Sequence, residues 1–116
     1  MPRQPVYAAT KAAVIQFTRS LSHLSQENIK VRAICPTYTL TDIITTNPET
    51  LERMKAEAGD FLTADRVAVA FRILVEDDTS DQTTMRCTAR NGVDYYNATP
   101  SIVPIPEEFS GLWSTQ

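Results

Sequence analysis

Apolar residues recur at helical spacing along the first part of the chain. Residues 6–26 contain neither glycine nor proline, and their apolar side chains are separated by gaps of three and four positions. These apolar positions are Ala9, Ala13, Val14, Phe17, Leu21 and Leu24. The pattern predicts one helix over residues 6–26, with Pro5 at its start. We expect the stripe formed by Ala13, Phe17, Leu21 and Leu24 to face the core.

An alternation of period two follows this helix and predicts a strand over residues 29–35, which Pro36 ends. The elements expected further along are a loop at 37–48, a helix at Pro48–Ala58 closed by Gly59, a helix capped by Thr63, a strand at 83–89 and a short strand at 93–96. Helices that alternate with strands indicate an α/β domain with parallel pairing. We expect the domain to cover residues 1–98, followed by an irregular tail at 99–116 that contains three prolines.

Length, charge and cysteine content argue against several classes of protein. The chain has 116 residues, enough for one domain, and a net charge of −3. An acidic protein lacks the basic surface that nucleic-acid binding requires. No apolar run approaches the ~18–20 residues that span a bilayer, and we expect no secretion signal because residues 1–5 lack an apolar stretch. Two well-separated cysteines and one histidine predict no disulfide framework and no metal site. We therefore expect a cytoplasmic protein with free thiols.

Tyr7 and Lys11 are the candidate catalytic pair. They lie four residues apart near the start of the first predicted helix, so both side chains share one face. A phenol is a weak acid, but a neighbouring ammonium favours its ionised form, so the two groups together could exchange a proton with an alcohol or carbonyl oxygen. The spacing alone is weak support, and a solvated helix start is the alternative.

The flanking sequence favours the catalytic interpretation. Tyr-Ala-Ala-Thr-Lys at residues 7–11 is followed, after a helix of suitable length, by Val-Arg-Ala-Ile-Cys-Pro-Thr at residues 31–37. In these blocks the chain resembles the C-terminal half of the short-chain dehydrogenase/reductase family, and within it the NAD-dependent 15-hydroxyprostaglandin dehydrogenases. The resemblance implies an α/β fold, the C-terminal half of a Rossmann-like doubly wound parallel sheet.

The resemblance also implies residue roles and a cofactor. Tyr7 would be the general acid/base, and Lys11 would assist it and bind the ribose of NAD, with NADP as the alternative. Gln4 would contact the substrate. The nicotinamide pocket would be lined by Pro36, Thr37, Thr39, Leu40 and Thr41. Residues 42–62 would form a lid over the substrate.

Two departures from the family bear on activity. Thr37 stands where the family usually has glycine, and its branched side chain crowds backbone near the nicotinamide. The glycine-rich phosphate turn of the N-terminal nucleotide-binding half, and the catalytic Ser and Asn, would lie upstream of Gln4 and are expected to be missing.

Two functions follow from these observations. We expect an NAD(P)-dependent oxidoreductase that converts a secondary alcohol to a ketone, incomplete or inactive as an isolated chain. The alternative is a catalytically silent truncated paralogue that acts as an interaction module. In the family the first helix also packs against its copy in a partner subunit, which implies a homo-oligomer.

Overall fold

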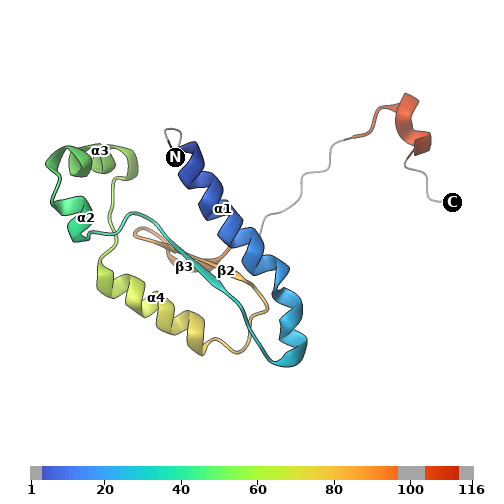
Figure 1. The fold of residues 1–116 in the computed structure, drawn as a ribbon, viewed down its shortest axis with the longest axis horizontal. Helices are drawn as coiled ribbons and strands as arrows, with labels where there is room; N and C mark the ends of the chain where they lie inside the picture. Colours follow the sequence, from blue (N-terminus) through green and yellow to red (C-terminus); the bar gives the residue numbers. More distant parts are fainter. Residues whose placement is uncertain (1–3, 97–103, 113–116) are drawn as a thin grey trace.

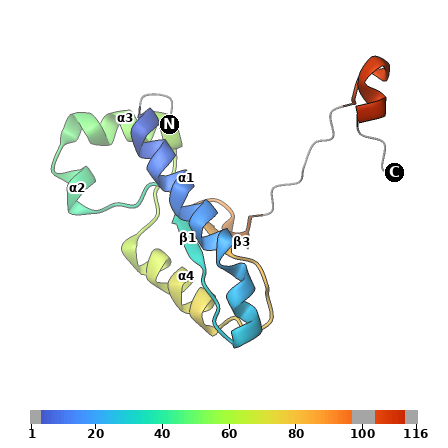
Figure 2. The same ribbon diagram turned by 45° about the vertical axis from the view of Figure 1, so that its right-hand side comes forward.

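The computed structural model describes residues 4–96 and 104–112 as an α/β fold (Figure 1). In chain order the elements are α1 (Pro5–Ser20), the 3₁₀ helix η1 (Ser22–Glu27), β1 (Ala33–Pro36), α2 (Asp42–Thr45), α3 (Pro48–Ala58), α4 (Ala64–Glu76), β2 (Thr84–Thr88), β3 (Gly92–Tyr95) and the 3₁₀ helix η2 (Glu107–Leu112). α1 and α4 lie on either side of the strands in both ribbon views (Figure 1 and Figure 2). The predicted α/β class is therefore confirmed.

The sheet has the strand order β1-β2-β3, so β1 and β3 form its edges. β1 pairs with β2 in parallel, with Ala33 opposite Thr84 and Pro36 opposite Cys87. β3 runs antiparallel to β2 because the chain turns back directly at Gly92, whose φ of 77° lies in the region that favours glycine. The predicted parallel pairing is confirmed for β1 and β2, and β3 makes the sheet mixed.

A small apolar core lies between α4 and the sheet. Leu62, Ala70 and Cys87 are buried together, and Leu62 is fully inaccessible to solvent. The side chains packed against these three are Ile34, Val67, Ala89 and Val93. These side chains come from the segment before α4, from α4 itself and from all three strands. Their burial away from water holds α4 against the sheet.

The other face of the sheet contacts α1, but not through the predicted stripe. Phe17 is 66% exposed and Val14 is 56% exposed, whereas Thr18 is the buried residue of α1. The prediction that the stripe containing Phe17 faces the core is wrong for this chain. Apolar residues occur on more than one side of α1, and the side that meets the sheet carries the half-buried Ile15 and the buried Thr18.

The first predicted helix and strand are both shorter than expected. α1 ends at Ser20, where hydroxyl groups compete for backbone carbonyls: Thr18 Oγ1 donates to Val14 O and Ser20 Oγ donates to Gln16 O, both at 2.9 Å. The chain continues as η1 and turns at Asn28, whose φ is 61°. β1 begins at Ala33 instead of residue 29 because its ladder with β2 begins only at that position.

α3 spans the predicted residues Pro48–Ala58 and α4 begins after the predicted cap Thr63, whereas the side-chain cap at Asn47 was not predicted. Asn47 Oδ1 accepts from Thr50 N at 3.1 Å at the start of α3, and Gly59 closes it with a φ of 74°. Thr63 Oγ1 accepts from Arg66 N at 3.3 Å at the start of α4. The short helix α2 lies in the segment predicted to be loop. In the predicted irregular tail, 107–112 form η2, and residues 99–103 and 113–116 lie outside the described residues.

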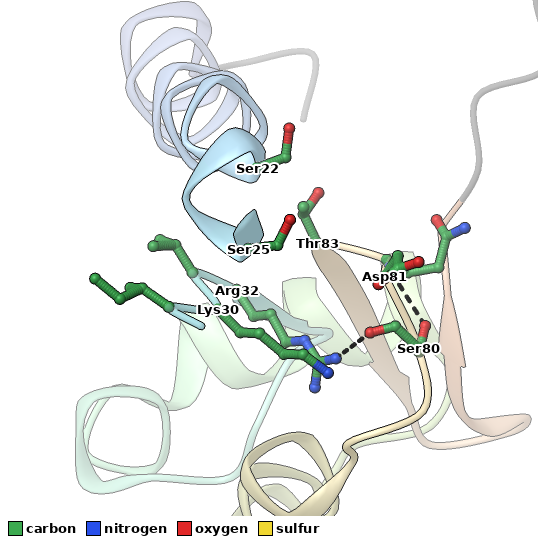
Figure 3. Close-up of a pocket in the computed structure, with 10 residues that line it drawn as sticks. Ser22, Ser25, Lys30, Arg32, Ser80, Asp81 and Thr83 are labelled. Carbon is green, nitrogen blue, oxygen red and sulfur yellow. Dashed lines mark hydrogen bonds between the residues drawn. The ribbon is translucent and has the colours of Figure 1, made fainter. Parts of the chain in front are cut away.

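Arg32 joins the end of α4 to the sheet (Figure 3). Its guanidinium donates to Leu74 O at 2.9 Å, to Asp77 O at 2.7 Å and to Ser80 O. The Tyr95 ring lies 6.0 Å from the guanidinium carbon, and the Tyr95 hydroxyl donates to the Asp77 carboxylate. We call these five residues the Arg32 junction. Beside it, a cavity of about 30 Å³ lies against η1, large enough for one water.

Candidate functional site

Tyr7 and Lys11 lie on the first turns of α1, where the sequence predicted them. Pro5 begins the helix, and Ala8 N donates to Gln4 O at 3.0 Å to close its first turn. The Lys11 Nζ lies 5.4 Å from the centroid of the Tyr7 ring, within the range of a cation–π contact. Tyr7 is half exposed, so an external oxygen atom can approach its hydroxyl. The two side chains are therefore neighbours on a face that remains open to a ligand.

A cavity of about 360 Å³ separates the start of α1 from β1. Its lining residues are Tyr7, Lys11, Val14 and Ile15 of α1 with Ala33, Ile34, Cys35 and Pro36 of β1. The wall is mostly apolar, and Tyr7 and Lys11 are its polar side chains apart from the Cys35 thiol. A few polar groups in an apolar hollow are typical of a small-molecule site.

Cys35 is part of this wall although sequence analysis assigned it no role. Burial raises the pKa of the Cys35 thiol, so the group is held in its neutral form beside the cavity. The alternation of side chains along β1 could be predicted from the sequence. Which side of the strand faces α1 could not be predicted.

The predicted nicotinamide residues follow β1 in one short segment. Among the described residues, Pro36 lines the cavity, whereas Thr37, Thr39, Leu40 and Thr41 continue past its edge. Thr37 N donates to Cys87 O at 2.9 Å, which extends the ladder by one bond, and Thr39 Oγ1 donates back to Thr37 O at 3.1 Å. Gln4 lies exposed directly before α1, and its side chain makes no capping hydrogen bond to the first helical amides.

Tyr38 lies in the segment after β1 and makes a contact that sequence analysis missed. Its hydroxyl donates to Glu57 Oε2 of α3 at 3.4 Å. Burial raises the pKa of Tyr38, as do the Glu57 carboxylate and the nearby Tyr7, while Arg53 opposes them. No spacing in the sequence links residue 38 to residue 7 or 57, so only the fold reveals this group.

The described residues fit one end of a dinucleotide. A hollow of about 360 Å³ is at the small end of ligand pockets, and matches a single ring with its substituents. The hydroxyl and amine groups at its mouth suit a ribose. Phosphate groups usually need a glycine-rich turn, and the three glycines of the sequence, Gly59, Gly92 and Gly111, are far apart.

Nowhere in 4–96 or 104–112 do three or more histidine, cysteine or acidic side chains gather in a way that could hold a metal ion. In the same part of the chain, every helix is too short or too polar to cross a bilayer.

Comparison with known proteins bears out the resemblance found in the motifs. The family model described as short chain dehydrogenase matches residues 1–52, which include Tyr7, Lys11 and Pro36. The chain resembles the short-chain dehydrogenase/reductase family. The matched segment ends within α3, so it contains α1, β1 and the cavity between them.

Individual relatives agree with the family match. The 15-hydroxyprostaglandin dehydrogenase [NAD(+)] of Rattus norvegicus is 29% identical over 120 residues, covering 90% of this chain and 45% of that protein. The oxidoreductase UcpA of Escherichia coli K12 is 30% identical over 112 residues, covering 90% of this chain and 43% of that protein. The chain thus spans less than half the length of these relatives. No solved structure gives a significant match.

Proposed function

We propose that this chain carries the proton-transfer part of a short-chain dehydrogenase/reductase that interconverts a secondary alcohol and a ketone. The observation that carries the proposal is the placement of Tyr7 and Lys11 at the mouth of the hollow between α1 and β1. The family match over residues 1–52 and the similarity to a 15-hydroxyprostaglandin dehydrogenase and to an oxidoreductase support the reaction class.

In the proposed reaction, the Tyr7 hydroxyl is the group that exchanges a proton with the substrate oxygen. During oxidation Tyr7 acts as a phenolate: the O–H bond of the alcohol breaks and its proton passes to the phenolate oxygen, while the hydride leaves the carbon that carries the alcohol oxygen. When bound, NAD supplies the acceptor for that hydride. Lys11 stabilises negative charge that develops on the phenol, because its ammonium lies against the same ring.

The remaining residues of the site serve binding. Lys11 would hold the ribose of the dinucleotide, and Pro36 with the wall of the hollow would pack against the nicotinamide. Thr37, Thr39, Leu40 and Thr41 would extend that contact beyond the strand. Gln4, at the entrance to α1, would contact the substrate. We propose NAD as the cofactor, with NADP as the alternative, because the similar 15-hydroxyprostaglandin dehydrogenase of Rattus norvegicus is named for NAD(+).

The proposal is tested by titrating NADH into the purified chain and following its fluorescence, then adding secondary alcohols with NAD⁺. We expect binding and alcohol-dependent NADH formation, with turnover lost in Tyr7→Phe. Arg19→Gln, at the far end of α1, is the matched control on the same helix. Absence of NADH binding up to millimolar concentration, the weak limit for specific sites, would refute the enzymatic proposal.

A second function is favoured by the exposed apolar surface of α1. Val6, Val14 and Phe17 are each more than half exposed, which is unusual for a helix that packs on a sheet. We infer a protein–protein contact through α1, with a second copy of the chain as the partner. This contact would also be available to a catalytically silent protein. We further infer a cytoplasmic location, since Cys35 and Cys87 are both free thiols.

A further inference from the structure

Residues 42–58, which contain α2 and α3, form a flap that leaves and rejoins the fold at one point. The two ends of the flap are joined by an isolated parallel bridge between Thr39 and Leu62. Two hydrogen bonds of 2.9 Å make this bridge, from Leu40 N to Leu62 O and from Leu62 N to Tyr38 O. Because Leu62 is fully buried in the core, the bridge fixes the base of the flap rigidly.

The body of the flap has few other attachments. Its two helices contact each other, and both views place them to one side of the sheet, with α3 at the same end of the molecule as the start of α1 (Figure 1 and Figure 2). The side-chain hydrogen bond that links α3 to β1's continuation is the one from Tyr38 to Glu57. This bond therefore bears directly on where α3 lies relative to the site.

Tyr38 is well held for such a contact. Its backbone carbonyl is bonded to Leu62, and its ring lies 6.4 Å from that of Phe61 at a tilted angle. A ring fixed at both its backbone and its face loses little further freedom when its hydroxyl bonds Glu57. Tyr38 thus bonds the last turn of α3, and both ribbon views place α3 at the same end of the molecule as the start of α1, which carries Tyr7 (Figure 1 and Figure 2).

We propose that Tyr38 is a positioning residue, whose hydroxyl bonds Glu57 and thereby holds α3 beside Tyr7. The inference rests on the proposed function only in treating Tyr7 as the group that acts on substrate. The contact itself is a property of the fold, and it assigns to the flap a defined resting position next to the cavity between α1 and β1.

The first test measures amide hydrogen exchange across α3 in the purified chain. Tyr38→Phe keeps the ring and removes the donor, and Glu57→Leu removes the acceptor, so each variant should speed exchange in α3 about two- to tenfold, as the loss of one hydrogen bond predicts. Glu57→Gln retains an acceptor oxygen and should restore slow exchange. Glu52→Leu is the matched control, because Glu52 lies on the same helix and pairs only with its neighbour Lys55.

The second test asks whether the contact positions α3 against Tyr7, which a purely stabilising bond would not do. With fluorotyrosine incorporated, the fluorine resonance of Tyr7 is assigned by its loss in Tyr7→Phe. We expect this resonance to shift in Tyr38→Phe and in Glu57→Leu, and to stay in place in Glu57→Gln and Glu52→Leu.

The proposal is overturned if exchange in α3 is unchanged in Tyr38→Phe, or if exchange rises while the Tyr7 resonance stays fixed. Neither readout requires bound cofactor or turnover. If both readouts respond as expected but the chain does not bind NADH, the proposed enzymatic function is refuted and the positioning role of Tyr38 is still supported.

Discussion

Replacing Arg32 tests whether its hydrogen bonds stabilise the packing of α4 against the sheet. Three backbone carbonyls, those of Leu74, Asp77 and Ser80, accept hydrogen bonds from this one guanidinium. They belong to the last turn of α4 and the loop after it, where carbonyls lack partners within the helix. Arg32→Met preserves the aliphatic stem and removes all three donors, so it isolates the hydrogen bonds from the packing.

The expected cost follows from the number and the exposure of these bonds. A hydrogen bond that involves a charged group contributes about 1.5–3 kcal/mol, which sets an upper limit of several kcal/mol for three. Arg32 is only half-buried, so water can replace part of what is lost, and we expect a decrease of about 2–4 kcal/mol in the free energy of unfolding. Arg32→Lys can bond one or two of the carbonyls and should lose roughly half as much.

Urea unfolding followed by far-ultraviolet circular dichroism measures these differences. Arg72→Met is the matched control, since Arg72 pairs with Glu76 on the exposed side of α4 at 2.8 Å. An exposed pair of this spacing contributes about 0.3–0.5 kcal/mol. If Arg32→Met were no more destabilising than Arg72→Met, the carbonyls would be equally well served by water and the reasoning about the Arg32 junction would be wrong.

Three further predictions concern the site, the pH dependence and the core. Tyr7→Phe should lower alcohol-dependent NADH formation about 10²-fold or more while NADH affinity, measured by fluorescence, changes little. Hydrogen bonding from Tyr95 holds the pKa of Asp77 well below its usual range, so its contribution to stability is present above the ordinary carboxyl pKa near ~4 and is lost as pH falls through the lowered value. Thermal unfolding as a function of pH should show this loss, and Asp77→Asn should remove it. Leu62→Ala should cost about 2–5 kcal/mol in urea unfolding because Leu62 is fully buried, whereas Ile43→Ala, at a position 86% exposed, should cost almost nothing.

The helices that could be predicted well from sequence were those with chemical start and stop signals. Thr63 and Gly59 mark ends that the structure confirms, because caps act through hydrogen bonds within a few residues. The length of β1 could not be predicted in this way. Residues 29–32 alternate like a strand, but a ladder requires a partner, and β2 reaches only as far as Ala33. Arg32 instead turns its side chain toward α4.

The candidate site likewise contains residues that could be predicted from local sequence and residues that could not. Tyr7 and Lys11 were predictable because their spacing within one helix fixes their relative placement. Tyr38 was not, because its relation to Glu57 depends on how an entire flap folds back. The buried face of α1 was likewise out of reach, since apolar residues around the whole helix give no direction to the sheet. Local periodicity predicts elements, and contacts between elements require the fold.

The bridge between Thr39 and Leu62 has a consequence for how such a protein can diversify. The chain between these two residues leaves and rejoins the sheet at one hydrogen-bonded bridge, so the pairing of the strands does not depend on the length of the insert. Residues 42–58 can therefore be replaced as one unit by a segment of another protein. A replacement insert would need an apolar residue in place of Ile44, which is buried. Grafting segments from other proteins between positions 42 and 58 is a route to new ligand preferences that leaves the α1–β1 hollow untouched.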